Sequence, residues 1–171
     1  MPRDWYDEWL PVHREWQQQQ WETIAGALRR LPEVREPFEV DQLQHALQMA
    51  TLVERETGDE ELVLCALCHD VGKLLAYKYH GEIAAEMLRP FISETNYHVV
   101  RVHQDFECYH VGAHNPPLAV RRERHLGAPW FDLAVQFSEW DQASFDPQGK
   151  AKHLEEFLPL VKSRCVNAGR R

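Results

Sequence analysis

Apolar residues recur along most of this chain at steps of three, four, seven or eight, the spacing of an α-helix rather than of a β-strand. In the first such segment the apolar positions are Val12, Trp16, Ile24, Leu28 and Leu31. This pattern predicts an N-terminal helix over residues 5–31, with Pro11 in its first turn. Two prolines, Pro32 and Pro37, mark a linker after that helix.

Two further helices are predicted between the linker and residue 70. Asp41 is a suitable N-cap for the first of them, which runs to about Glu56 and is ended by Gly58. The second begins after Asp59, where acidic residues suit a helix N-terminus. Its residues 62–67 are hydrophobic on nearly every side. We therefore expect it to be the buried central helix.

The rest of the chain also has a helical pattern. Predicted helices cover residues 80–88, 93–110 and 118–126, a segment that starts at residue 129 and passes Trp140, and residues 150–164. Pro159 is expected to bend or break the last of these. With no convincing strand, repeat or boundary, the sequence predicts an all-α helical bundle that forms one domain over residues 1–171.

Length, charge and cysteine content narrow the function classes. The chain has 171 residues and a formal net charge of −8, which disfavours a nucleic-acid partner because such surfaces are basic. No apolar run reaches the ~20 residues of a membrane span, and no apolar leader opens the chain. We therefore expect a cytoplasmic protein without a membrane partner. Cys65 and Cys68 lack the second cysteine pair of a zinc ribbon, so we interpret them as buried packing residues.

Metal-ligating side chains recur at apolar stripes and at helix ends. They are His45, His69, Asp70, His80, His103 and Asp141. Six nitrogen and oxygen ligands exceed the four of a structural zinc site. If one aspartate bridges two ions, each ion receives three or four ligands and keeps a position open for substrate or water. The set therefore predicts a dinuclear metal site, within a core of about residues 41–145.

The order His…His-Asp…His…His…Asp resembles that of the HD-domain superfamily of helical metalloproteins. The resemblance extends over about residues 45–159, with local matches at residues 44–48, 69–73, 80–82 and 140–142. The short separations between the second, third and fourth histidines are similar to those of its compact oxygenase branch, which includes inositol oxygenase and the phosphonate-cleaving HD oxygenases.

The resemblance to that branch implies two iron ions in a mixed-valent Fe(II)/Fe(III) pair. One iron would be held by His45, His69, Asp70 and Asp141. The other would be held by Asp70 as the bridging ligand, together with His80 and His103. Lys73 matches a lysine that contacts substrate in inositol oxygenase, so it is the candidate catalytic and substrate-binding residue. A lysine in that place also occurs in some HD phosphodiesterases.

The chain departs from the phosphonate-cleaving members at three positions. Those members carry a tyrosine and a glutamate before the helix of the first histidine, where this chain has Arg35 and Phe38. They also carry a lysine after the fourth histidine, where this chain has Glu107. An acid in that place favours a neutral or cationic substrate. Pocket-lining residues are predicted on one face of the same helix: Glu107, His110 and His114.

Three functions are compatible with this ligand set. An oxygenase would use O2 to cleave a C–C or C–heteroatom bond in a small hydroxylated substrate. A phosphohydrolase would use Mn, Mg or Zn to hydrolyse a phosphoester or nucleotide, and a sensing module would keep the metals without turnover. Hydrolysis benefits from cationic groups beside the phosphate, and near the ligands the sequence offers only Lys73, Lys78 and Arg101. The compact size and the short spacing of the ligands favour the oxygenase.

Overall fold

The computed structural model describes residues 5–110 and 116–168, which form helices and short 3₁₀ turns without a strand. The predicted all-α bundle is therefore confirmed. The α-helices are α1 (Trp5–Arg30), α2 (Gln42–Thr57), α3 (Glu60–Cys68), α4 (His80–Leu88), α5 (Glu94–His110), α6 (Pro116–Ala119), α7 (Phe131–Ala143) and α8 (Leu154–Ala168). The 3₁₀ turns are η1 (Leu31–Glu33), η2 (Val71–Leu74), η3 (Tyr77–Tyr79), η4 (Arg89–Phe91) and η5 (Arg121–His125).

Local capping fixes the ends of α2 and α3 where the sequence predicted them. The Asp41 carboxylate accepts the backbone N–H groups of Leu43 and Gln44, both at 2.9 Å. Gly58 ends α2 at φ 63°, a left-handed conformation that favours glycine. Asp59 then caps α3 through its side chain.

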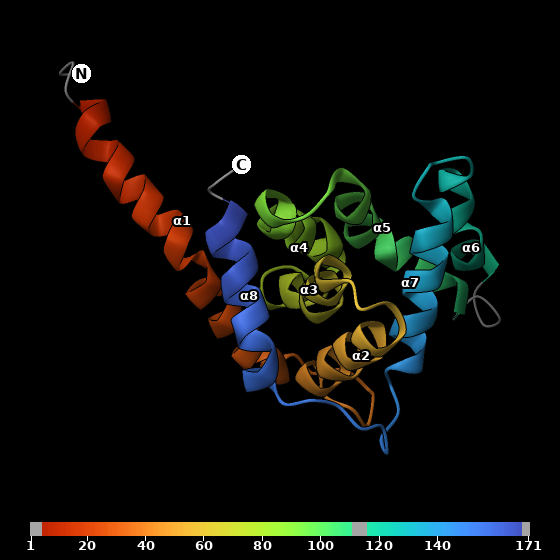
Figure 1. The fold of residues 1–171 in the computed structure, drawn as a ribbon. Coiled ribbons are helices and arrows are strands. Elements are labelled where there is room, and N and C mark those ends of the chain that lie inside the picture. The colour runs from red at the N-terminus through yellow and green to blue at the C-terminus, as the bar shows by residue number, and fades with distance from the viewer. Residues whose placement is uncertain (1–4, 111–115, 169–171) are drawn as a thin grey trace.

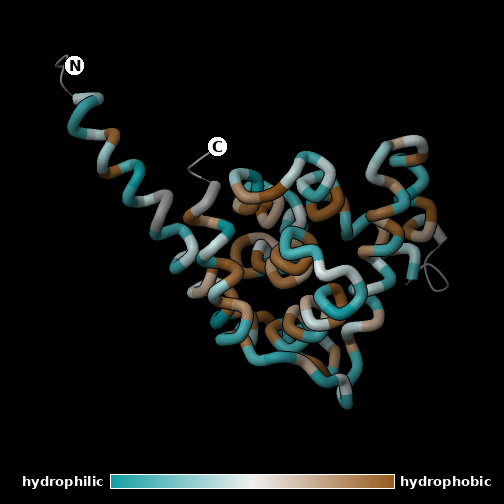
Figure 2. The backbone as a smooth tube through the Cα atoms, in the orientation of Figure 1, coloured by the Kyte–Doolittle hydropathy of each residue, from teal (hydrophilic) through white to brown (hydrophobic). Residues whose placement is uncertain are grey.

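Helix α3 lies in the middle of the helical body and contacts α2, α5 and α8 (Figure 1). Its residues Leu64–Cys68 are all completely buried, as the hydrophobic pattern predicted. Cys65 and Cys68 are free thiols within this core, which agrees with a packing role. Figure 2 shows the hydrophobic stretches concentrated in the same body. The C-terminal end of α3 therefore presents its last residues to the interior of the protein.

Two glycines allow α4 to approach the residues that follow α3. A Cβ atom on Gly72, in η2, would lie 2.7 Å from the Cα atom of His80. A Cβ atom on Gly81 would lie 3.0 Å from the carbonyl oxygen of Arg101 on α5. The absence of a side chain at both positions lets η2, α4 and α5 meet closely, and this brings the first residue of α4 beside Asp70.

Helix α1 has two halves with different surroundings. Ile24 and Leu28 in the C-terminal half are completely buried and pack beside α8. The N-terminal half extends away from the body (Figure 1), and Trp16 there is 74% exposed. The helix begins at Trp5, so Pro11 lies inside α1 rather than in its first turn. Within the described residues, no helix combines the length and apolar character needed to cross a bilayer.

The predicted helix over residues 118–126 is wrong. The structure has the short helix α6, a turn at Val120 and then the 3₁₀ turn η5. The segment 121–125 consists of Arg, Arg, Glu, Arg and His, so it has no apolar stripe to bury. Without such a stripe a short helix gains little from tertiary packing.

The last helix is displaced from its predicted range of residues 150–164. It begins at Leu154, because the backbone N–H of His153 donates to the Glu156 side chain at 2.8 Å and the N–H of Glu156 donates back to His153. The N–H of Lys152 bonds instead to Thr51 on α2. Pro159 lies within α8, which continues through it. The expected break is therefore absent from this helix.

Candidate metal centre

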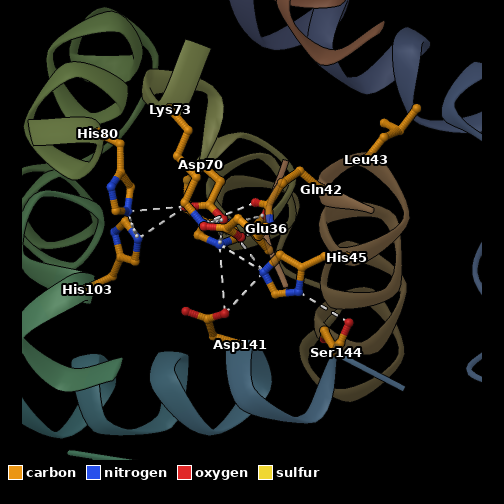
Figure 3. Close-up of polar contacts among 12 residues, drawn as sticks. Glu36, Gln42, Leu43, His45, Asp70, Lys73, His80, His103, Asp141 and Ser144 are labelled. Carbon is orange, nitrogen blue, oxygen red and sulfur yellow. Dashed lines mark hydrogen bonds and ion pairs between the residues drawn. The ribbon is translucent and has the colours of Figure 1, made fainter. Parts of the chain in front are cut away.

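Six polar side chains converge in the interior from five helices (Figure 3). They are His45 from α2, His69 and Asp70 from the end of α3, His80 from the start of α4, His103 from α5 and Asp141 from α7. Each of the six residues is no more than 2% exposed. The structure therefore brings together every candidate ligand that the sequence suggested. They come from segments that are up to 96 residues apart, between His45 and Asp141.

Each histidine ring is oriented by a backbone carbonyl at its Nδ1 atom. The Nδ1–O distances are 3.2 Å from His45 to Ser144, 2.8 Å from His69 to Ala66, 2.6 Å from His80 to Tyr77 and 2.7 Å from His103 to Val100. A carbonyl oxygen only accepts hydrogen bonds, so these contacts assign the proton to Nδ1. The Nε2 atom of each neutral ring then carries a lone pair.

The Nε2 atoms face one another in two pairs. The Nε2 atoms of His45 and His69 are 3.2 Å apart, and those of His80 and His103 are 3.0 Å apart. Two lone pairs at such distances repel unless a cation lies near both. Imidazole nitrogens held by an Nδ1–H bond to a carbonyl are typical metal ligands. The chemistry of these donors therefore fits metal ions.

Asp70 lies between the two histidine pairs. Its Oδ1 atom is 3.2 Å from Nε2 of His80 and 3.6 Å from Nε2 of His103. Its Oδ2 atom is 3.3 Å from Nε2 of His69 and 3.8 Å from Nε2 of His45. Oδ1 is buried and accepts no hydrogen bond from any residue in the described ranges. A buried carboxylate oxygen without a donor is costly, and a bound cation would compensate it.

Asp141 adds a second carboxylate to the pair formed by His45 and His69. Its Oδ1 atom lies 3.1 Å from Nε2 of His45 and 3.9 Å from Nε2 of His69. Burial raises the pKa of Asp141, but His45 and His69, when they also carry a proton on Nε2, outweigh it and lower the pKa to about 2. Asp141 is therefore a carboxylate across the physiological pH range.

Glu107 lies one turn after His103 on α5 and faces the same centre. Ligand atoms of His103, Glu107 and Asp141 all lie within 4.8 Å of one another. Burial and the negative charge of Asp141 raise the pKa of Glu107 to about 7. The sequence singled out Glu107 only as a pocket-lining residue. Its spacing of four from His103 indicated a shared helix face, but nothing local indicated how near Asp141 would be.

Lys73 is held by other side chains of the protein beside Asp70. Its Nζ atom is 2.8 Å from Oδ2 of Asp70, 3.2 Å from Oε1 of Glu36 and 3.1 Å from Oε1 of Gln42. Burial lowers the pKa of Lys73, but Asp70 and Glu36 raise it more, so the ammonium stays charged. Contact between Lys73 and substrate stays a prediction. Sequence analysis did not identify Glu36, which lies between Arg35 and Phe38.

The loop after α7 supports the ring of His45. Phe145 stacks on that ring with centroids 3.9 Å apart and an angle of 13° between the planes. Phe38, from the linker before α2, packs on Phe145 in turn. The Gln48 side chain donates to the carbonyl of Asp146 at 2.7 Å and so ties the loop to α2. Sequence analysis did not identify these supporting contacts.

The remaining predicted pocket residues lie farther along α5. Nε2 of His110 is 3.4 Å from the hydroxyl of Ser138 on α7, one turn before Asp141. His110 does not belong to the groups of side chains that could hold an ion. His114 lies outside the described residues.

The fold and the site together define a helical protein with buried His and Asp groups that could hold divalent metal ions. The family model of the HD domain matches residues 43–128, half of the chain. The chain belongs to the HD domain family, whose members are generally metal-dependent enzymes. A search of curated proteins found no match. The matched range includes the four histidines and Asp70, whereas Asp141 lies after it.

Proposed function

We propose that this protein is an enzyme with two metal ions. One ion is assigned to His45, His69, Asp70 and Asp141, and the other to Asp70, His80 and His103. The observation that carries the assignment is the position of Asp70, whose two oxygens each face one pair of Nε2 atoms. Ligands of this type suit iron, manganese and zinc.

We further propose that the ions are iron and that the reaction is an oxygenation. When bound, a mixed-valent iron pair supplies Lewis acidity and the redox chemistry needed to use O2. The substrate is then a small hydroxylated compound that is neutral or cationic, in which a C–C or C–heteroatom bond is cleaved.

The charges around the ligands support this choice of substrate. Within the described ranges, Lys73 is the only lysine or arginine that forms an ion pair with any of the six proposed ligands. Its charge is already balanced by Asp70 and Glu36. Glu107 adds a further acid. A phosphoester usually needs cationic groups beside the phosphate, and these acids would oppose it.

The chain's own residues have distinct tasks in this proposal. The backbone carbonyls hold the four Nδ1–H groups and so keep the Nε2 atoms directed at the ions. Lys73 positions Asp70 between the two halves of the site. Glu107, whose carboxylate lies within 4.8 Å of ligand atoms of His103 and Asp141, accepts the proton that a substrate hydroxyl releases. Phe145, stacked on the ring of His45 and packed against Phe38, limits the access of water to that ring.

The test is electron paramagnetic resonance of iron-loaded protein partly reduced with ascorbate. The proposal predicts two irons per chain and a signal from a coupled Fe(II)/Fe(III) pair. It also predicts O2 consumption with at least one small hydroxylated compound. An uncoupled signal together with a preference for redox-inert ions would contradict the oxygenase.

The alternative is a metal-dependent phosphohydrolase that uses Mn, Mg or Zn. The bridging position of Asp70 supports it equally, because two ions joined by a carboxylate can also activate water for attack on a phosphoester. Release of phosphate from nucleotides by the manganese-loaded protein, without O2 consumption by the iron-loaded protein, would favour this alternative.

A further inference from the structure

A cavity lies on the side of α5 that faces away from the metal centre. Its volume is about 610 Å³, and η3, α4, α5, η5 and Trp130 contribute to its wall. Arg101 and Asp105 line it, and each is two positions from His103 on α5. Two positions correspond to about 200° around a helix. Helix α5 therefore separates this cavity from the proposed ligands.

The cavity carries an excess of positive charge although the whole chain has a net charge of −8. Its basic side chains are Lys78, Arg101, Arg121 and Arg124, and its acids are Glu82 and Asp105. Asp105 is occupied by two partners: Arg121 at 2.7 Å and Nε2 of His125 at 2.9 Å. Among the described residues, neither Lys78 nor Arg101 nor Arg124 makes an ion pair within 4.0 Å.

Aromatic and imidazole rings form another part of the wall. Trp130 lines the cavity, and the imidazole of His98 stacks on it with centroids 5.4 Å apart and 13° between the planes. Tyr79, which lies in η3, also lines the cavity and is 53% exposed. Aromatic faces of this kind favour flat rings as ligands. The volume lies within the usual range of small-molecule sites, roughly 300–1,000 Å³.

We propose that this cavity binds a small phosphorylated compound that carries a flat ring. Arginine binds phosphate oxygens through two parallel N–H groups, and Arg101 and Arg124 supply such groups from different elements, α5 and η5. The ring packs against the aromatic side chains of the wall, Tyr79 and Trp130. This ligand is distinct from the substrate of the metal centre.

The location of the cavity links the ligand to the arrangement of α4 and α5. Lys78 and Tyr79 directly precede His80, and the Tyr77 carbonyl accepts the Nδ1–H of that histidine. Arg101 lies on α5, which carries His103. A phosphate held by both Lys78 and Arg101 ties η3 to α5. We therefore expect ligand binding to slow amide hydrogen exchange in residues 77–82 and 98–105.

The first experiment is calorimetric titration of the full chain with AMP, ribose 5-phosphate and adenosine. The proposal predicts one AMP per chain, and binding at least tenfold weaker for ribose 5-phosphate and for adenosine. Equal affinity for AMP and ribose 5-phosphate would overturn the role of the ring. No binding of AMP at millimolar concentration would overturn the site.

Substitutions of the basic residues that line the cavity test whether AMP binds there. The double variant Arg101→Gln/Arg124→Gln should lose at least tenfold in AMP affinity, and the single variant Lys78→Gln should also bind AMP more weakly than the original chain. All three side chains are on the surface, so thermal unfolding should stay close to that of the original chain. The matched control is Arg55→Gln, an exposed arginine on α2, which should bind AMP as the original chain does.

The phosphate of AMP could also bind at the metal centre. A variant of that centre is therefore needed to distinguish the two sites. Asp141→Asn changes a proposed ligand and should leave AMP affinity unchanged. If Asp141→Asn abolishes binding while Arg101→Gln/Arg124→Gln retains it, the ligand occupies the metal centre and the inference is wrong. That outcome would also favour the phosphohydrolase alternative, whereas absence of AMP binding in every variant would overturn this inference alone.

Discussion

The Nε2 atoms of His80 and His103 lie 3.0 Å apart, although the Nδ1 atom of each ring already faces a backbone carbonyl. Two neutral rings in this tautomer have no proton to share between the two Nε2 atoms. A positive charge must therefore compensate the contact, either an added proton or a metal ion. Whether the site holds protons or metal ions determines how its stability depends on pH and on added metal.

Loss of a single carboxylate should remove metal. Asp141→Asn keeps the shape of the side chain but removes the charge 3.1 Å from Nε2 of His45. We expect at least one of two bound ions to be lost, as measured by elemental analysis after dialysis, and the same result for His45→Ala. The matched control is Asp132→Asn, an exposed aspartate of the same helix, α7, which should keep both ions. Two ions retained in Asp141→Asn and His45→Ala would refute the ligand assignment.

The close approach of η2 to α4 predicts a large effect of one methyl group. Gly72→Ala would place a Cβ atom 2.7 Å from the Cα atom of His80, both within backbone segments that cannot move independently. We expect a loss of about 2–4 kcal/mol in the free energy of unfolding, measured with urea.

A second glycine provides the control for this substitution. Gly26 lies within α1, and a Cβ atom there meets nothing within 4 Å. Gly26→Ala should therefore stabilise the protein by about 0.5–1 kcal/mol, because alanine favours helix. A similar cost for both substitutions would show that packing at Gly72 is not the cause.

Without metal, the stability of the protein should fall as the pH rises above neutrality. Burial lowers the pKa of His45, but Asp141 and Asp70 raise it more, and for His69 the charge of Asp70 likewise outweighs burial. A raised histidine pKa stabilises the fold fully below the unfolded value of 6.5, and this contribution is lost as the pH rises through the folded pKa.

At acidic pH, protonation of Asp141 reduces the stability of the metal-free protein. The pKa of Asp141 is lowered to about 2, so its contribution is present above the unfolded value of 3.8 and is lost as the pH falls toward 2. In chelator, the combined contribution of His45, His69 and Asp141 to the free energy of unfolding should therefore be greatest between about pH 4 and pH 6.5. Added metal displaces the protons, so the rise in Tm that it causes should be larger at pH 8 than at pH 5.5. An equal rise at both values would contradict proton–metal competition.

The raised pKa of Glu107 predicts that replacing this residue changes the stability of the metal-free protein by an amount that depends on pH. The pKa of Glu107 is raised from 4.5 to about 7, chiefly by burial, so its destabilising effect begins above the unfolded value of 4.5 and is complete above pH 7. Glu107→Gln should increase the free energy of unfolding by about 2 kcal/mol at pH 8. It should have little effect at pH 4.5, where the acid is protonated in the folded protein.

The control for Glu107→Gln is another glutamate that faces solvent. Glu139 on α7 is exposed, and Glu139→Gln should change stability little at either pH. An equal effect of Glu107→Gln at pH 4.5 and pH 8 would indicate altered packing rather than a buried charge.

The sequence was most informative where local chemistry determines the structure. Asp41, Gly58 and Asp59 cap α2 and α3 through contacts within three or four residues, so the ends of these helices could be predicted. The candidate ligands could be found because each lies on an apolar face or at a helix end. The sequence could not show that Oδ1 and Oδ2 of Asp70 face different histidine pairs, since this depends on how α3, α4 and α5 pack.

The sequence was least informative where a contact joins distant segments. Glu36 reaches Lys73 across 37 positions, and Ser144 reaches His45 across 99. Neither residue has a neighbour in the sequence that signals its partner. The start of α8 was misplaced for the same reason, because Lys152 bonds to Thr51 on α2 instead of continuing a helix toward its N-terminus.

The four rings differ in how their orientation is secured. His69, His80 and His103 each bond to the carbonyl three positions earlier. Each ring therefore keeps its orientation while its own turn stays folded. His45 depends on Ser144 and Phe145 in the loop after α7. A brief opening of that loop frees one ring without unfolding any helix. Exchange of the ion at His45 with the solvent should therefore be faster than exchange of the ion at His80 and His103, and its rate should follow the motion of this loop.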